Sequence, residues 1–462
     1  MRAETIAEQL ARQISTAMES AVLTPETIHA VERLILDSMA CALGAADSPA
    51  VKVMRRWAKR IGGTAEATLL ATGEKSSAMG AAMVNSAMIR DLDMNDTYFS
   101  NNPAHSSDNI GACLAVAEAE GSSTIDVIKS ILIAFEVQMR CCEFTKSSFF
   151  KTRGWDQTTL VTIASAAAAG ALLHLDQERL TNAIAIAGCY PTLGEVRVGQ
   201  MSMLKGASAG ISAAHGVEAA YLAKEGLTGA REVFEGQRGL GNQVLGECDW
   251  SVLTAPMDKW RLPLTCLKRY PAAYINHAAI DISLALVKEH GITPDKIEHV
   301  TVDGFGWLIE DMVNGMGGTS RYEVDERETA DHSLPYIVAI SLVEGKYEIG
   351  QLRARKWELP EVKAMMAKIT CVHDKAMDAV FPPDRPSRVT IKLTNGQTVV
   401  KELPYPKGDY RDPFTDEELA AKFRNLTADV LSPAQQEKAI ATALNFSKNS
   451  LPELIAACAP GR

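Results

Sequence analysis

Acidic side chains gather between Asp91 and Asp96, and a histidine follows shortly after them. Asp91, Asp93 and Asp96 stand within six residues at the expected end of a helix, and His105 comes nine residues later. Carboxylates this close repel one another unless a cation lies between them, so we expect at least one raised pKa. The pattern is compatible with a solvated turn that caps a helix, with a Mg²⁺ site, or with acid–base chemistry by Asp93 and His105.

The Mg²⁺ interpretation would make the protein similar to all-helical enzymes that hold diphosphates through Asp-rich motifs. The sequence shows no second acidic motif downstream, which weighs against this interpretation. The spacing is also not that of an EF-hand, because glycine at loop position 6 and glutamate at position 12 are absent. A single histidine is more often structural than catalytic, so acid–base chemistry needs support from further residues.

Two basic segments could bind an anion. Lys205 directly precedes an Ala-rich helix, and the positive end of a helix dipole is a favourable place for a carboxylate. Lys268 and Arg269 are adjacent cations beside an apolar run, which could form an anion clamp. The alternative for each segment is an ordinary exposed turn with basic side chains.

A fourth motif, Glu328–Tyr336, places Asp331, His332 and Tyr336 where they could face a cleft. Other chemical signals are weak or missing. The glycines around residue 316 lack the strand–turn–helix context of a nucleotide fingerprint, and no P-loop, zinc-protease or nucleophile-elbow motif occurs. The candidates for chemistry are therefore polar residues scattered over four motifs.

Composition limits the possible functions. The chain has 462 residues, of which 47% are hydrophobic and 23% charged, so it is long enough for two to three folded domains. Its 57 acidic and 47 basic residues give a net charge of −10, which disfavours nucleic acid and anionic membranes as partners. An anionic substrate would need a local concentration of cations.

The cysteine pattern indicates a cytoplasmic protein. The nine cysteines form no CxxC pair and lie in apolar segments, as buried thiols do in a reducing compartment. The first 18 residues do not resemble a signal peptide, and the weakly polar stretch Leu160–Leu173 is too short to span a bilayer. We therefore expect a soluble, cytoplasmic location.

The elements that must position these residues change in type along the chain. Up to about residue 260 the apolar periodicity is helical, and the Ala-rich runs 164–169 and 207–214 predict central helices with close neighbours. An alternating strand at 298–303 and a hairpin closed on Asn395-Gly396 follow, with helices between them. Helical periodicity returns after Thr415.

We accordingly predict a mainly α fold with an α+β part. A large all-helical bundle domain would comprise residues 1–264 and 406–462, and would therefore be discontinuous. A smaller α/β lid domain would comprise residues 265–405.

Taken together, the motifs resemble the MmgE/PrpD family, which includes 2-methylcitrate dehydratase, cis-aconitate decarboxylase and iminodisuccinate epimerase. The resemblance covers most of the chain. It rests on motifs in the family's order: LDMNDTY at 92–98 with HSSDNIG at 105–111, GWDQTT at 154–159, RVGQMSMLKG at 197–206, LKRYP at 267–271 and TADHSLPY at 329–336.

The resemblance implies a helical domain plus a smaller α/β lid, a homodimer, and a site between the domains. The polar positions that match the family's motifs are Asp93, Thr97, His105, Lys205, Lys268 and Tyr336. On this basis we assign proton transfer to His105, with Asp93 orienting it or acting as its partner, and either residue as base or acid. We expect the cations Lys205, Lys268 and Arg269 to bind substrate carboxylates.

The remaining roles concern contacts to the substrate. Thr97 and Tyr336 would donate hydrogen bonds to it, and Asp156 would orient the departing hydroxyl or a lysine. The expected activity is dehydration of 2-methylcitrate or a similar hydroxy acid, within propionate metabolism, by proton abstraction α to a carboxylate. The prediction includes no metal and no cofactor, because fixed cations can absorb the charge that develops.

Three departures bear on the substrate. Trp155-Asp156 is closer to the dehydratase-like members, whereas Ala273 stands where dehydratases tend to have glutamate and Ser106 replaces the usual proline. The alternatives within the family are decarboxylation of cis-aconitate and epimerisation of iminodisuccinate. Outside the family they are a Mg²⁺-dependent diphosphate enzyme and a helical scaffold protein.

Overall fold

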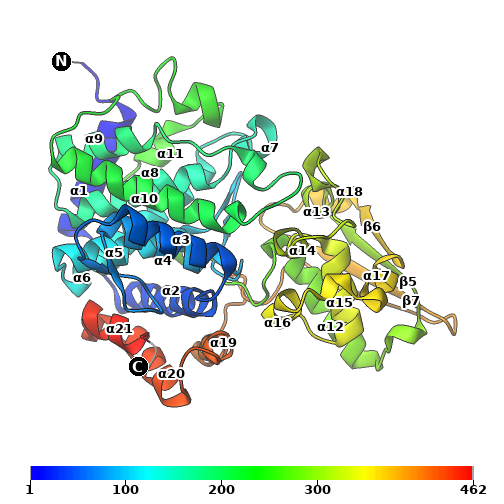
Figure 1. Cartoon of the computed structure of the whole chain (residues 1–462). Coiled ribbons are helices and arrows are strands. Elements are labelled where there is room, and N and C mark those ends of the chain that lie inside the picture. Colours follow the sequence, from blue (N-terminus) through cyan, green and yellow to red (C-terminus); the bar gives the residue numbers. More distant parts are fainter. Residues whose placement is uncertain (1, 460–462) are drawn as a thin grey trace. The chain divides into compact units, whose positions relative to one another are not determined.

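The computed structural model describes residues 2–459 and divides into two compact units. Unit 1 comprises the described residues up to Gly194, then Gly206–Thr265 and residues 414–459. Unit 2 comprises Glu195–Lys205 and Cys266–Pro413. The predicted class, a large helical part and a smaller part with a sheet, is confirmed (Figure 1).

Unit 1 is built almost entirely from helices. Its described residues also form two short hairpins, β1–β2 (Ala67–Thr68, Lys75–Ser76) and β3–β4 (Tyr98–Phe99, Pro103–Ala104). Its helices are α1 Ile6–Ser20, α2 Pro25–Gly44, α3 Pro49–Ile61, α4 Ala78–Asp91, α5 Ile110–Glu120, α6 Thr124–Glu143, α7 Phe149–Arg153, α8 Thr158–Leu172, α9 Gln177–Ala187, α10 Leu204–Lys224, α11 Trp250–Thr254, α19 Asp416–Thr427, α20 Pro433–Ala443 and α21 Leu451–Ala457.

The core of unit 1 is formed by helices whose small residues permit close packing. Every residue of α8 is buried, and so is every residue of α4 except Met79. A Cβ atom at Gly111 of α5 would lie 2.5 Å from the Ser86 nitrogen of α4, and one at Gly216 of α10 would lie 2.6 Å from the Thr162 carbonyl oxygen of α8. The prediction of central Ala-rich helices is confirmed, because only small side chains allow these backbone distances.

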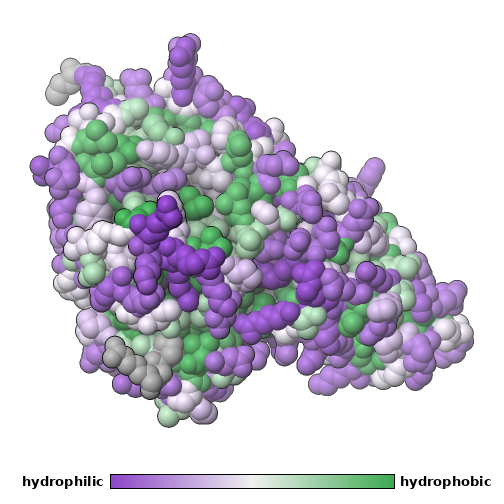
Figure 2. Space-filling model, in the orientation of Figure 1, coloured by the Kyte–Doolittle hydropathy of each residue, from purple (hydrophilic) through white to green (hydrophobic). Residues whose placement is uncertain are grey.

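The exterior of unit 1 has a different character. On α3, one face buries Ala50, Val51, Met54 and Ala58. The opposite side is mostly hydrophilic (Figure 2) and exposes the basic side chains of Lys52, Arg56, Lys59 and Arg60, beside two apolar ones, Val53 and Trp57. This alternation of an apolar and a charged face at helical spacing is what a helix at the surface of a core requires.

The C-terminal helices pack on the helices of unit 1. Helix α19 begins with a capping box in which Thr415 and Glu418 exchange hydrogen bonds, and Arg33 of α2 forms an ion pair with Asp416. Helices α19 and α20 both contact α2, and α21 contacts α5 (Figure 1). The last described segment of the chain therefore belongs to the same core as the first.

Unit 2 contains a four-stranded sheet in the order β6-β5-β7-β8. Strand β5 (Ile297–Gly304) pairs in parallel with β6 (Ile369–His373) and antiparallel with β7 (Ser387–Leu393), which pairs with β8 (Thr398–Leu403). The helices of unit 2 are α12 His277–His290, α13 Gly306–Met312, α14 Arg327–Ala330, α15 Leu334–Glu344, α16 Ile349–Arg353, α17 Pro360–Met366 and α18 Lys375–Asp378.

The predicted hairpin is confirmed at β7–β8. The turn residue Gly396 has φ 86°, and the backbone N–H of Gln397 donates to the Asn395 side chain at 2.9 Å. A left-handed glycine after asparagine is the geometry that such a short turn needs. Helix α12 contacts β7 and β8, and the side chains of Val389 and Ile391 are fully buried.

The predicted domain boundaries differ in detail from the boundaries of the two units. Residues 195–205 and 406–413 belong to unit 2, whereas the boundaries from the sequence place them with the helical domain; Thr265, predicted in the lid domain, belongs to unit 1. Among residues 2–459 no single helix is long and apolar enough to cross a membrane, although α2 and α3 pass that test jointly as a pair bent by 92°.

Candidate functional site

Asp93 follows the C-terminal end of α4 in an unusual backbone conformation. Its φ is 52°, in the left-handed region that residues other than glycine rarely adopt and that aspartate tolerates better than most. Its Oδ1 accepts a hydrogen bond of 2.6 Å from the guanidinium of Arg90, and both side chains are only 2% exposed. A buried cation thus holds this carboxylate at the helix end, where the sequence analysis expected one to be needed.

His105 is oriented by the backbone of the same loop. Its Nδ1 lies 2.6 Å from the carbonyl oxygen of Asp96, and the residue is 9% exposed. Because a carbonyl oxygen can only accept, Nδ1 carries the proton, and a neutral imidazole then has its lone pair on Nε2. The geometry therefore fixes the tautomer that can take up a proton at Nε2.

Asp96 is a fully buried acid beneath this histidine. Its Oδ1 accepts hydrogen bonds from the backbone N–H of Ser107 at 3.1 Å and from the Ser107 hydroxyl at 2.6 Å. Its Oδ2 has no hydrogen-bond partner among the described residues. Burial raises the pKa of Asp96 to about 7, although the bonds from Ser107 oppose the rise. One raised pKa in this acidic segment was expected, but desolvation rather than mutual repulsion is its main cause.

Polar side chains connect the two halves of the loop. The amide of Asn95 donates to the Ser107 hydroxyl at 2.9 Å and to Oδ1 of Asp108 at 3.0 Å. The hydroxyl of Thr97 donates to the carbonyl oxygen of Ala104 at 3.3 Å, across the β3–β4 hairpin. These bonds hold the Asp93 and His105 segments in one register.

Asp156 occupies a capping position in unit 1. Its Oδ1 accepts hydrogen bonds from the backbone N–H of Thr158 at 2.9 Å and from the Thr158 hydroxyl at 2.7 Å, and the residue is fully buried. These bonds satisfy donors at the start of α8. Its predicted role toward a substrate stays a prediction.

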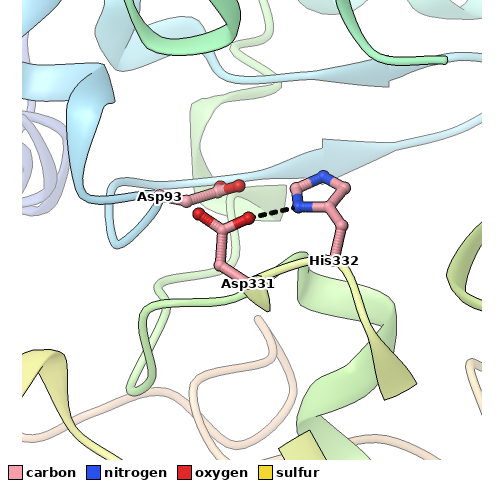
Figure 3. Close-up of side chains that lie close together, drawn as sticks. All are labelled: Asp93, Asp331 and His332. Carbon is pink, nitrogen blue, oxygen red and sulfur yellow. Dashed lines mark hydrogen bonds and ion pairs between the residues drawn. The ribbon is translucent and has the colours of Figure 1, made fainter. Parts of the chain in front are cut away.

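Unit 2 contains a buried cluster of charged residues around Asp331. The Lys205 ammonium forms an ion pair with Oδ1 of Asp331. Nδ1 of His332 lies 2.7 Å from the same carboxylate oxygen, and Figure 3 shows this second contact. The side chains of Lys205, Asp331 and His332 are 3%, 0% and 9% exposed. The carboxylate holds the Nδ1 proton of His332, so a neutral His332 presents its lone pair on Nε2.

The segment that carries Lys205 is held by a buried arginine. The guanidinium of Arg321 donates to the carbonyl oxygen of Gly199 at 3.0 Å and to that of Arg197 at 3.4 Å, and Arg321 is fully buried. A Cβ atom at Gly318 would lie 2.5 Å from the Cα of Gly199. Two glycines therefore let the loop after α13 approach the Lys205 segment closely.

The second basic segment contains one buried and one exposed cation. Lys268 is fully buried, and the chain beside it is anchored by a hydrogen bond of 2.8 Å from the Leu267 N–H to the Gly408 carbonyl. Arg269 is exposed, and its guanidinium carbon lies 5.8 Å from the centroid of the Tyr270 ring. Lys268 is therefore the stronger candidate for a cation in a dry environment.

Tyr336 packs within an aromatic cluster of unit 2. Its ring meets those of Tyr347 and Trp357 edge to face, each at a centroid distance of 6.3 Å. The residue is fully buried, and its hydroxyl has no hydrogen-bond partner within residues 2–459. Burial also raises the pKa of this phenol. The aromatic packing explains the position of the Tyr336 ring. The hydrogen bond expected between its hydroxyl and a substrate stays a prediction.

Comparison with protein families matches most of the chain to the two domains of one family. The MmgE/PrpD N-terminal domain matches residues 8–253, and the MmgE/PrpD C-terminal domain matches residues 270–448. The chain belongs to the MmgE/PrpD family. The resemblance seen in the sequence motifs is thereby confirmed.

Two enzyme names occur among relatives of this MmgE/PrpD protein. Human cis-aconitate decarboxylase is 25% identical over 453 residues, which cover 94% of this chain and 90% of the relative. The 2-methylcitrate dehydratase of Escherichia coli K12 is 25% identical over 460 residues, which cover 90% of this chain and 89% of the relative. The 2-methylcitrate dehydratase of Cupriavidus necator is 26% identical over 444 residues, which cover 90% of this chain and 88% of the relative. At these identities the names support a family of lyases without separating its activities.

Within the MmgE/PrpD chain, the predicted site residues divide evenly between the two units. Asp93, Thr97, His105 and Asp156 belong to unit 1. Lys205, Lys268, Arg269 and Tyr336 belong to unit 2. In unit 1 the structure joins the Asp93 and His105 segments through one hydrogen-bond network, and in unit 2 it joins Lys205 to the Glu328–Tyr336 motif.

Sequence reasoning assigned no role to three residues that form these clusters. Arg90, which binds Asp93, carried a weak signal, because a cation three residues before a carboxylate at a helix end can pair with it. Asp331 and His332 were noted in their motif, but no role was assigned to them. The pairing of Asp331 with Lys205 joins positions 126 residues apart, which no local pattern indicates.

Proposed function

We propose that this MmgE/PrpD protein is a metal-independent lyase that dehydrates 2-methylcitrate or a closely similar hydroxy acid. The observation that carries the proposal is the orientation of His105, whose Nδ1 is held on a carbonyl so that Nε2 is suited to proton transfer. The dehydratase names of two relatives and the Trp155-Asp156 pair support this substrate class.

The proposed step removes water across a carbon–carbon bond. A base takes the proton from the carbon next to a carboxylate, and the electron pair left behind forms the new double bond. The neighbouring carbon–oxygen bond breaks, and an acid gives a proton to the departing hydroxyl, which leaves as water. His105 and Asp93 are the proposed proton-transfer pair, and His332 on Asp331 is a second group with the right tautomer.

Buried cations support an anionic substrate. Lys205 and Lys268 are 2% and 0% exposed in a chain whose net charge is −10. A carboxylate that gains charge during proton removal is stabilised most by cations in a water-poor environment, where preorganised groups supply several kcal/mol. The Lys205 ammonium is paired with the buried Asp331 carboxylate, so its charge is held in a fixed position.

Decarboxylation of cis-aconitate is the second candidate, because human and mouse cis-aconitate decarboxylases match most of the chain. In that reaction a carbon–carbon bond to a carboxylate breaks, carbon dioxide leaves, and a proton is added to the carbon that keeps the electron pair. The same histidine and lysines would serve, with His105 as an acid. The two reactions differ in their products, so product analysis separates them.

The test is a substrate panel on the purified protein. Incubation with 2-methylcitrate, citrate, cis-aconitate and iminodisuccinate, followed by proton NMR, should show a dehydrated product from 2-methylcitrate. The same rate is expected after treatment with EDTA. Carbon dioxide release from cis-aconitate would favour the second candidate, and a rate that disappears with chelator and returns with Mg²⁺ would overturn the metal-independent mechanism.

A further inference from the structure

A lysine near the C-terminal end of the chain reaches the backbone of the Asp93 loop. Lys422 lies on α19, and its side chain is only 8% exposed. Its ammonium donates to Oδ1 of Asp37 on α2 at 2.6 Å and to the carbonyl oxygen of Met94 at 2.6 Å. Three segments that are distant in sequence, all within unit 1, meet at this one nitrogen.

The carbonyl that Lys422 holds belongs to the residue directly after Asp93. Asp93 has the left-handed φ of 52°, which costs about 1–3 kcal/mol for a residue other than glycine and persists only where the surroundings determine it. Arg90 donates a hydrogen bond to the side chain of Asp93. Lys422 binds the carbonyl of the following residue, so one cation contacts the Asp93 side chain and another contacts the next residue's carbonyl.

Stability alone does not account for a buried lysine here. A buried ion pair is often no more stabilising than apolar residues of the same volume, because both charges lose their hydration. Burial by itself would lower the pKa of Lys422, but the Asp37 carboxylate, together with Cys41 and Asp96, outweighs this, and the pKa is raised. Lys422 is therefore charged at neutral pH, and it supplies a donor to Met94 that no apolar side chain could supply.

We propose that Lys422 is a positioning residue that sets the backbone of Asp93, and with it the direction of the Asp93 carboxylate. Its effect on turnover rests on the proposed function, whereas its effect on the loop does not. The C-terminal segment would then contribute to catalysis through this contact, without itself touching substrate.

The experiment compares a variant that removes only the Asp37 charge with double variants that remove the Lys422 donor and leave neither charge buried. Asp37→Asn keeps Lys422 and an acceptor for it, whereas Asp37→Asn with Lys422→Met removes both charges and the bond to Met94. Asp37→Leu with Lys422→Met is a second, fully apolar replacement of the pair. Lys438→Met, at an exposed position on α20, is the control for loss of a lysine in this segment. Circular dichroism establishes that each variant is folded.

The first measurement is hydrogen exchange of the peptide that contains residues 92–97. We expect exchange about tenfold faster in each double variant than in Asp37→Asn, because the loop has lost its anchor. The second is turnover of whichever acid the panel identifies. We expect kcat to fall by about tenfold or more in the double variants with KM within about threefold, since misplacing a catalytic group costs rate.

Equal exchange of residues 92–97 in Asp37→Asn and in the double variants would overturn the inference. So would a loss of kcat in Asp37→Asn or in Lys438→Met as large as in the double variants, because the effect would then follow stability or charge and not the Met94 contact. If the wild-type protein turned over none of the acids, the proposed function would fail, and the exchange measurement would still decide the role of Lys422.

Discussion

At the scale of single residues, the two candidate histidines are oriented in the same way by different acceptors. His105 donates Nδ1–H to a backbone carbonyl, and His332 donates it to the Asp331 carboxylate. In both cases the acceptor determines which nitrogen is left to exchange a proton. A histidine placed by such a bond differs physically from one that merely fills space in a core.

His105→Ala tests the proton-transfer role directly. We expect kcat to fall by about 10²-fold or more, because a positioned acid or base contributes that much to a rate. The control is His290→Ala at the exposed end of α12, which should leave kcat unchanged. Steady-state kinetics with the identified substrate provide the measurement, and an alanine variant as active as the wild type would remove His105 from the mechanism.

Asp96 predicts a characteristic dependence of stability on pH. Its pKa is about 7 in the folded protein against an ordinary value of 3.8. Between these values the folded state holds a proton that the unfolded state releases, so the wild type should lose stability as the pH rises from about 4 to about 7. Asp96→Asn removes this titration.

Urea unfolding of the wild type and Asp96→Asn at pH 5 and pH 8 measures the effect. The stability of the wild type should fall by about 2–3 kcal/mol more than that of the variant between the two pH values. Only the difference between the two proteins in this change of stability reports on Asp96, because other buried acids such as Asp311 titrate in both. Parallel behaviour of the two proteins would mean that Asp96 is ionised when folded.

At the scale of elements, two helix termini and the loops beside them provide most of the candidate groups. Asp93 follows the C-terminal end of α4, and Lys205 lies in the first turn of α10. Each is adjacent to irregular backbone that is anchored by a buried arginine, Arg90 in one unit and Arg321 in the other. Rigid helices with anchored loops can hold side chains precisely while leaving their polar ends accessible to chemistry.

Gly318→Ala tests the anchoring of the Lys205 segment. The added Cβ would lie 2.5 Å from the Cα of Gly199, so one of the two backbones must move. We expect a loss of about 1–3 kcal/mol in stability together with weaker turnover, since the displaced segment carries Lys205. The matched control is Gly350→Ala on α16, where a Cβ meets nothing within 4 Å and stability should not fall. Chemical denaturation that finds the two variants equally stable would contradict the close-contact argument.

At the scale of the whole molecule, the proposed catalytic groups are distributed over two compact units. Unit 1 contributes the proposed proton-transfer pair, and unit 2 contributes buried cations. This division is consistent with a reaction that needs both a base and fixed positive charge. The excess of acidic residues elsewhere makes these local cations the more necessary for an anionic substrate.

We further predict that the protein is a homodimer in solution. Large apolar side chains remain exposed on the single chain, among them Trp57 at 50% and Leu193 at 60%, and burial of such surface drives association. Sedimentation velocity should give a mass of about twice 49.9 kDa. A mass of 49.9 kDa over the whole working range of concentration would rule out the dimer.

The amino-acid sequence by itself determined the features that depend on neighbours along the chain. The Asn395-Gly396 turn follows from the φ that glycine allows, and the Ala-rich helices follow from residue size and helical spacing. Motif order identified the family, and residue types indicated where acids, bases and cations stand. These signals lie within a few residues of one another, so they can be read without knowing the fold.

Only the tertiary structure decided which of these residues act on one another. It placed Tyr336 among aromatic rings, Asp156 at a helix start, and Lys205 beside Asp331. It also brought Lys422 to the carbonyl of Met94, far away in sequence. Such contacts arise because burial brings distant segments together and then requires each polar group to find a partner, and that choice depends on the packing of the whole core.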